Sequence, residues 1–85
     1  MSKLDKKLAR LKSRPKDYKW CDIEAVFKGL GFKIIQGKGS RVKFYDENNG
    51  LVCDLHKPHP DPVMKSYAIN IVLTFLIDNG YIDND

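Results

Sequence analysis

A glycine-rich turn and an alternating strand meet in the stretch Gly37-Lys38-Gly39-Ser40-Arg41-Val42-Lys43-Phe44. Glycine has no Cβ, so such a turn allows backbone N–H groups to approach a phosphate closely. The strand that follows places Val42 and Phe44 on one side and directs Arg41, Lys43 and Tyr45 to the other. One face is therefore predicted to pack on a core, while the opposite face presents cations and an aromatic ring and favours polyanion binding. A simple hairpin turn beside a solvated basic edge explains the same residues.

Two further strands are predicted on either side of this one, over residues 32–36 and 51–56. The turn before the last strand contains Asn48-Asn49-Gly50, residues that tolerate positive φ and are typical of a tight hairpin. Both connections have hairpin length, which predicts an antiparallel sheet whose middle strand, 41–46, pairs with both others. The last strand should direct Asp54 and His56 to the face that carries Arg41. Three prolines, Pro58, Pro60 and Pro62, then exclude a regular ladder or helix.

Helices are predicted on both sides of the sheet in the sequence. A short amphipathic helix over residues 3–13 has leucines at helical spacing and ends at Arg14-Pro15, because the residue before proline is forced out of helical geometry. A second helix covers residues 21–30 and stops at Gly31. We expect Trp20, just ahead of it, to pack on the core. A final helix begins near Ser66, a good N-cap, and ends at Asn79-Gly80.

The last helix is more apolar than one buried face requires. Ile69, Val72, Leu73 and Leu76 suffice to cover the sheet, which leaves Ile71, Phe75 and Ile77 at its sides. This surplus indicates either a partner or homodimer surface, or a wide stripe held between the sheet and the N-terminal segment. The predicted fold class is α+β, with the order α-β-β-β-α and an extra N-terminal helical arm.

Length and composition predict one small domain, since 85 residues leave little room for a second core. Two cysteines are too few for the disulfide framework of a small secreted protein. The charged N-terminus does not resemble a signal peptide, and the apolar run near the C-terminus is shorter than a membrane span. We therefore expect a soluble cytoplasmic protein.

The net charge of +4 is unevenly distributed. Residues 1–19 hold eight basic and two acidic residues, whereas residues 20–85 hold seven basic and nine acidic ones. We therefore divide the chain into a basic, partly helical arm, 1–19, and a domain, 20–85. A basic arm attracts nucleic acid by counterion release with little sequence preference. A solubilising, partly disordered leader is the alternative.

The motifs of this chain resemble those of the HicA family of toxin–antitoxin ribonucleases. The resemblance covers about residues 20–80 and rests on the Lys-Gly-Ser loop that opens the second strand, on His-x-Pro-His at the end of the third, and on Lys65 ahead of the last helix. It implies a fold like a double-stranded-RNA-binding domain, metal-independent cleavage of messenger RNA, no cofactor, and neutralisation by a HicB-like antitoxin. The family usually has its catalytic histidine directly after the Gly-Ser pair, and here that residue is Arg41.

This departure moves the search for a proton-transfer residue to the two histidines, His56 and His59. Histidine exchanges protons near neutral pH. Arginine stays protonated and is instead a bidentate phosphate clamp. We assign proton transfer to His56, which shares the predicted outer face with Arg41, and keep His59 as a candidate on the proline-rich loop; Asp54 is placed to orient a histidine. The predicted RNA-binding residues are Lys33, Lys38, Gly39, Ser40, Lys43, Tyr45 and Lys65.

Two other chemistries are disfavoured by the residue pattern. Zinc binding by Cys53, His56 and His59 is weak as a hypothesis, because Cys53 and His56 should point to opposite faces of one strand. Ser40 as a nucleophile lacks a base and an orienting group at suitable spacing. Two functions stay open: a HicA-like ribonuclease, and a relative without catalysis that binds RNA or an antitoxin.

Overall fold

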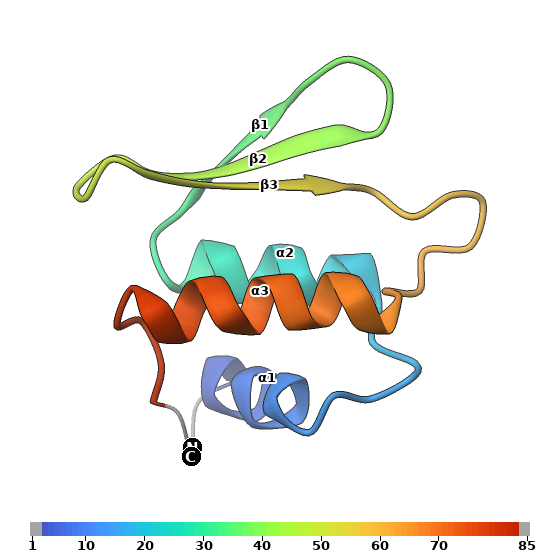
Figure 1. The fold of residues 1–85 in the computed structure, drawn as a ribbon, viewed down its shortest axis with the longest axis horizontal. Coiled ribbons are helices and arrows are strands. Elements are labelled where there is room, and N and C mark those ends of the chain that lie inside the picture. Colours follow the sequence, from blue (N-terminus) through green and yellow to red (C-terminus); the bar gives the residue numbers. More distant parts are fainter. Residues whose placement is uncertain (1–2, 84–85) are drawn as a thin grey trace.

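Three strands and three helices make up the computed structural model, which describes residues 3–83. In chain order they are α1 (Lys3–Lys12), α2 (Trp20–Gly29), β1 (Lys33–Gln36), β2 (Arg41–Asp46), β3 (Leu51–His56) and α3 (Ser66–Asp78). Figure 1 shows the sheet on one side of the molecule, α2 and α3 beneath it, and α1 beneath that pair. The predicted α+β class and the α-β-β-β-α order are confirmed.

The sheet is antiparallel, with β2 between β1 and β3 as predicted. Its register places Phe44 opposite Ile34 on one side and opposite Cys53 on the other. Because directly opposed residues share a face, this row and the row of Val42 and Leu55 point toward the helices. Burial follows the same alternation, since Val42, Phe44, Cys53 and Leu55 are all buried. The opposite face of β2 and β3 is left to solvent.

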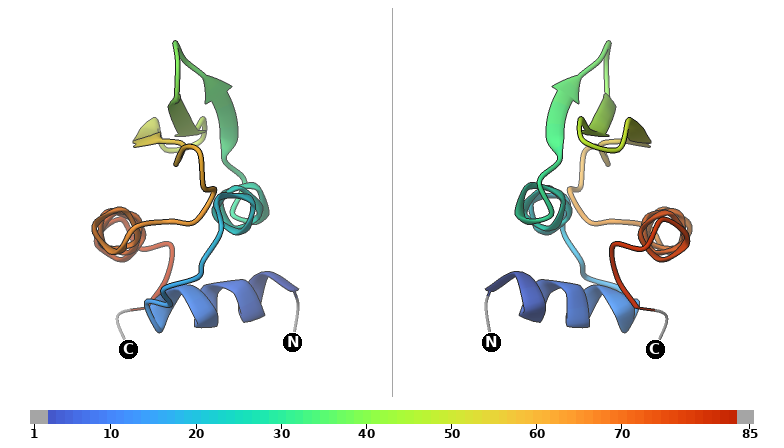
Figure 2. Two further views of the ribbon diagram at one scale, coloured as in Figure 1. Left: turned by 90° about the vertical axis from the view of Figure 1, so that its right-hand side faces the viewer. Right: turned by 90° about the vertical axis from the view of Figure 1, so that its left-hand side faces the viewer.

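The core lies between the inner face of the sheet and the helix pair α2 and α3. Figure 2 shows these two helices side by side and end-on, with α1 running across them. Phe27 of α2 stacks on Phe44 with a ring-centroid separation of 4.2 Å, and it meets Phe32 in a T-shaped arrangement with the ring centroids 4.9 Å apart. Trp20 was predicted just ahead of α2 but is its first residue. It packs on the core as expected, with its ring centroid 5.6 Å from that of Phe44.

Both core helices end where the sequence predicts, at a glycine in the left-handed region. Gly31 has a φ of 92° and Gly80 a φ of 78°. At the end of α2 the N–H of Gly31 bonds to the carbonyl of Lys28, and that of Phe32 to Phe27. This pair of bonds satisfies carbonyls that the helix leaves unpaired. The prediction for the start of α3 needs correction: Ser66 is its first helical residue, and Lys65 occupies the cap position without a side-chain cap.

The apolar surplus of α3 is largely buried within the chain. Phe75 packs near Phe27, Phe32 and Tyr81, and Ile77 is half-buried against the core. Ile71 alone of the three surplus side chains stays exposed. Burial against the rest of the chain thus accounts for most of the surplus, and a homodimer stays a prediction. Within residues 3–83 no helix has the length and apolarity needed to cross a lipid bilayer.

The N-terminal segment packs into the domain. Leu11 of α1 and Tyr18 in the connection to α2 are fully buried, so a disordered leader does not describe these residues. Leu4 lies so close to Gly29 of α2 that a Cβ at Gly29 would sit 2.8 Å from its side chain. The Tyr18 hydroxyl donates to the carbonyl of Lys7, and burial, with a smaller contribution from Asp22, raises the pKa of Tyr18 to about 12.

Candidate functional site

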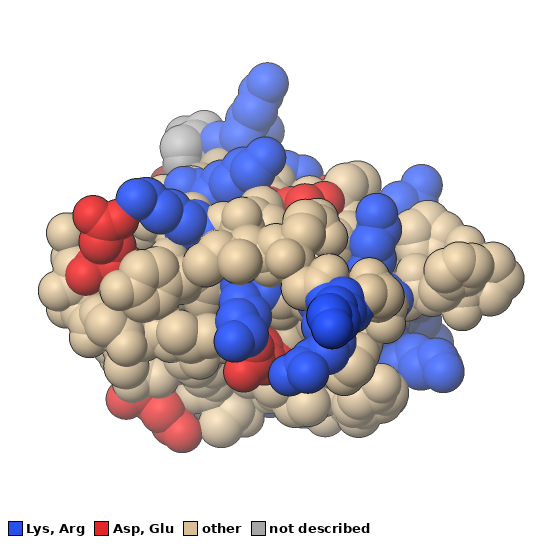
Figure 3. Space-filling model, turned by 90° about the horizontal axis from the view of Figure 1, so that it is seen from above, with Lys and Arg blue, Asp and Glu red and all other residues tan. Residues whose placement is uncertain are grey.

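The outer face of the sheet is built from cross-strand rows. Arg41 lies directly opposite His56, and Lys43 directly opposite Asp54. Arg41, Lys43, Asp54 and His56 are all exposed, and Tyr45 is half-buried on the same face. Figure 3 looks onto this side of the molecule and shows basic side chains grouped over it, with acidic ones among and beside them. The alternation in the sequence therefore brings Arg41 and His56 together, as predicted.

A hydrogen bond joins the glycine-rich loop to the end of β3. Ser40 Oγ lies 3.3 Å from His56 Nδ1, and the N–H of Lys57 donates to the carbonyl of Ser40 at 2.7 Å. The serine hydroxyl either donates to Nδ1 or accepts from it, depending on the tautomer of the ring. In both cases Nε2 is left to face a ligand, as a proton donor in the first and as an acceptor in the second.

The loop between β1 and β2 exposes a row of backbone donors. Gly37 closes the hairpin, since its N–H donates to the carbonyl of Arg41 at 2.8 Å. Any Cβ at Gly37 would approach Arg41 to 3.2 Å, and Gly39 has a φ of 63°, so both positions suit glycine. In the part of the chain that the structure describes, the N–H groups of Lys38, Gly39 and Ser40 make no hydrogen bond.

Three cations of this hairpin have no ion pair within the described residues. Lys38, Arg41 and Lys43 form no salt bridge with any residue between 3 and 83. Lys33 differs, because its ammonium is paired with Glu47 across the β1–β2 ladder, and this hydrogen bond and charge raise the pKa of Lys33. Lys33 is thus on the predicted face but is partly neutralised there.

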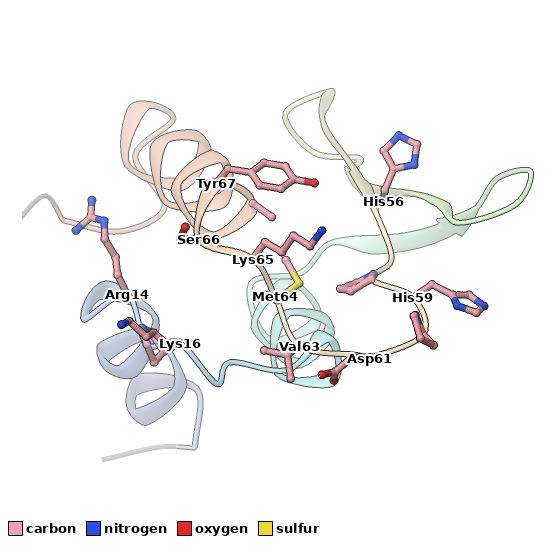
Figure 4. A pocket seen from close by; sticks show the side chains of 14 residues that line it. Arg14, Lys16, His56, His59, Asp61, Val63, Met64, Lys65, Ser66 and Tyr67 are labelled. Atoms are coloured by element: carbon pink, nitrogen blue, oxygen red, sulfur yellow. The ribbon is translucent and has the colours of Figure 1, made fainter.

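His59 and Lys65 lie beside the sheet face, around a groove that also touches His56. Figure 4 shows the ring of His59 pointing outward from the proline-rich loop, away from Lys65 and Tyr67. His56 is the histidine that the structure brings next to Ser40 and Arg41. Lys65 extends from the start of α3 toward the end of β3 (Figure 4).

Cys53 points away from this face. It is buried on the inner side of the sheet, and burial, followed by the charge of Asp54, raises the pKa of its thiol to about 11. His56, on the same strand, is exposed on the outer side of the sheet. The side chains of Cys53 and His56 therefore do not face a common ion. Over residues 3–83 no three His, Cys, Asp or Glu side chains are grouped closely enough to hold a metal.

Sequence reasoning missed two residues near His56. Tyr67 lines the groove and is 63% exposed, although it lies in the first turn of an otherwise apolar helix. The sequence could have indicated this exposed ring, because Tyr67 lies outside the buried apolar stripe of α3. Lys57 was overlooked because its contribution is a backbone N–H to Ser40, which no side-chain pattern reveals.

Comparison with known families identifies the family of the chain. A family model described as HicA toxin of bacterial toxin–antitoxin matches residues 20–74, which include α2, the sheet and most of α3. Neither the curated proteins nor the solved structures that were compared gave a match. The family match covers more than half of the chain and includes Ser40, Arg41 and His56. The chain therefore belongs to the HicA toxin family.

Proposed function

We propose that this chain is the toxin of a type II toxin–antitoxin pair and acts in the cytoplasm as an endoribonuclease on messenger RNA, without a metal. The observation that carries the proposal is the contact between Ser40 Oγ and His56 Nδ1, 3.3 Å apart, beside Arg41. It joins a proton-transfer group, an orienting hydroxyl and a permanent cation at the end of one exposed strand pair.

The reaction has three chemical requirements. A base takes the proton of the attacking 2′-hydroxyl, an acid protonates the leaving 5′-oxygen, and cations stabilise the charge of the phosphorane. His56 supplies proton transfer through Nε2, and the Ser40 hydroxyl orients the ring through Nδ1 in either tautomer. Arg41 stays protonated and clamps the phosphate. His59 stays a second candidate for proton transfer, since it lines the neighbouring groove.

RNA is bound along the outer face of the sheet and the loop before β2. Lys38 and Lys43 supply cations that form no ion pair with residues 3–83, and the N–H groups around Gly39 supply donors suited to phosphate oxygens. Tyr45 contributes an aromatic ring on the same face, and Lys33 a weaker, paired charge. These contacts neutralise phosphate charges of the RNA and do little to distinguish one RNA sequence from another.

A HicB-like antitoxin is the proposed protein partner, and it covers this same face. Ile35 and Val52 are 46% and 42% exposed, and the register aligns both with the outward row of Lys43 and Tyr45. Exposed apolar side chains among cations suit a protein surface better than a polyanion alone. Covering the face would exclude RNA from His56.

The alternative function is binding without catalysis. Arg41 favours it, because it stands where the family usually has the catalytic histidine. Under this alternative the outer face still binds RNA or an antitoxin, and His56 has no role in proton transfer.

Expression of the chain alone, with and without the neighbouring reading frame, tests the proposal. We expect growth arrest and loss of full-length transcripts, relieved when an adjacent HicB-like protein is co-expressed. The purified chain should cut RNA in the presence of EDTA. Harmless expression together with intact RNA in vitro would reject the ribonuclease and leave the binding function.

A further inference from the structure

A groove of about 820 Å³ lies beside His56, between the proline-rich loop 57–65 and the first turn of α3. Pockets that hold small organic ligands typically measure about 300–1,000 Å³, so the groove is large enough for a nucleotide. Figure 4 shows Tyr67 and Lys65 extending from α3 toward the side where β3 ends at His56. The groove thus continues from the proposed reaction site along a surface that the sheet does not provide.

The charges around the groove favour an anion. Arg14, Lys16 and Lys65 line it, against one carboxylate among the lining residues, Asp61. Lys16 and Lys65 have no ion-pair partner in the described residues, whereas Arg14 donates through Nε to Asn70. In Figure 4 Asp61 lies beside Val63, on the side away from Tyr67.

Tyr67 adds a flat aromatic surface to these cations. Its side chain is 63% exposed, and within residues 3–83 it makes no hydrogen bond and no ring contact. Apolar atoms of Pro58, Val63 and Met64 also line the groove. Figure 4 shows Lys65 beside Tyr67. An exposed aromatic ring near a cation is the arrangement on which an unpaired base stacks while its phosphate binds the cation.

We propose that this groove binds one unpaired nucleotide adjacent to the phosphate at His56, with the base stacked on Tyr67 and a phosphate held by Lys65. The inference rests on the proposed function, because it places the nucleotide next to the reacting phosphate. It also narrows the substrate class. A base inside a duplex is stacked and paired, so it is not available to Tyr67. RNA bound at this site is therefore single-stranded or locally unpaired.

The test measures binding separately from cleavage. The probe is a short fluorescein-labelled RNA of mixed sequence with 2′-O-methyl groups, which lacks the attacking hydroxyl, used as a single strand and as a duplex. Fluorescence anisotropy is measured for the wild type, Tyr67→Ala and Tyr67→Phe. The matched control is Ile71→Ala, on an exposed position of the same helix outside the groove.

We expect Tyr67→Ala to weaken single-strand binding by about 5- to 150-fold, the range of one lost base stack. Tyr67→Phe keeps the ring and should bind like the wild type, as should Ile71→Ala. Duplex binding should be unchanged in all variants. Equal single-strand affinity of Tyr67→Ala and the wild type would overturn the inference, and so would an equal loss with duplex.

Cleavage of an unmodified RNA, assayed in parallel, separates this inference from the proposed function. A wild type that cuts nothing but loses single-strand affinity on Tyr67→Ala rejects the ribonuclease and supports the groove. A wild type that cuts RNA, with a Tyr67→Ala form of unchanged affinity, rejects the groove alone.

Discussion

Two basic residues of α1, Lys7 and Arg10, differ from the three cations of the glycine-rich loop and β2 in what their charges contact. Lys7 Nζ lies 2.8 Å from Asp22 Oδ1, and Arg10 pairs with Asp17 at 2.6 Å and lies 5.3 Å above the Tyr18 ring. Lys38, Arg41 and Lys43 have no ion-pair partner among residues 3–83. The N-terminal segment has the larger net charge, but part of that charge is paired with carboxylates of the same chain.

This difference teaches where to look for a polyanion site. When a protein cation neutralises a phosphate, counterions condensed on the RNA are released. A cation already paired with a carboxylate releases fewer of them, because its charge is partly neutralised within the protein. Asp22 connects α1 to α2 by accepting from Lys7 and from the Lys19 N–H. Net charge by segment points to the N-terminus, but Lys7 and Arg10 there are already paired with carboxylates. The cations next to His56, Lys38, Arg41 and Lys43, have no such partner among residues 3–83.

The largest effect is expected from truncating the buried side chain of α1. Leu11 is fully buried, so Leu11→Ala removes packed methyl groups and should lower the free energy of unfolding by about 2–5 kcal/mol. Urea denaturation monitored by circular dichroism measures this change in the free energy of unfolding. If α1 were a dispensable arm, Leu11→Ala would leave the unfolding midpoint unchanged, and the contrast between the two regions would fail.

A matched pair of lysine substitutions tests the contrast in RNA binding. Lys43→Met removes an unpaired cation and should reduce the slope of log affinity against log salt by about 0.7 for a single-stranded probe. Lys7→Met removes a paired cation and should leave the slope nearly unchanged, at a stability loss of about 0.5 kcal/mol because both partners are partly exposed. Equal slopes for the two variants would contradict the account.

Acid unfolding provides the smallest and most specific effect. Burial alone would raise the pKa of Asp22, but its hydrogen bonds to Lys7 and to the Lys19 N–H and its charge interactions with Lys7 and Arg10 hold it below the ordinary 3.8. A carboxylate with a lowered folded pKa stabilises the fold above its unfolded pKa, and this contribution is lost as pH falls below about 4.

Asp22→Asn should therefore reduce stability at pH 7 by about 1 kcal/mol or less, and the gap to the wild type should close as the pH falls through 3. Thermal unfolding across this range measures the gap. Asp46 adds acid dependence in both proteins, since the Tyr81 hydroxyl first and Asn49 second lower its pKa. A gap that stays constant with pH would show that the Asp22 charge does not stabilise the fold.

The sheet was the most predictable part of the fold. Strict alternation around Phe44 and the Asn48-Asn49-Gly50 turn predict the bounds of β2 and β3 and the face of each side chain, and these agree with the structure. The first strand is one residue shorter than predicted, since it begins at Lys33 and leaves Phe32 to the core. The packing of α1 was not predictable, because a thin stripe of leucines does not state which surface it covers. The surface that α1 covers depends in part on Gly29, which has no side chain and so leaves room for Leu4.

The candidate site divides in the same way. Period-two alternation predicts that Arg41 and His56 share a face, since each strand is regular. The bond from Ser40 to His56 depends on loop conformation, and the groove depends on how residues 57–65 pack on the 18–20 segment through bonds such as Met64 N–H to the Tyr18 carbonyl. Contacts between distant loops have no periodic signature in a sequence.

The central claim, that proton transfer lies at His56 and charge at Arg41, is tested most directly by cleavage rates of purified variants. His56→Ala should lower the rate by about 10²-fold or more while leaving circular dichroism and binding of the 2′-O-methyl probe unchanged. Arg41→Lys should keep part of the rate, because a cation remains although the bidentate fork is lost. A folded His56→Ala protein that cleaves RNA at the wild-type rate would contradict the account.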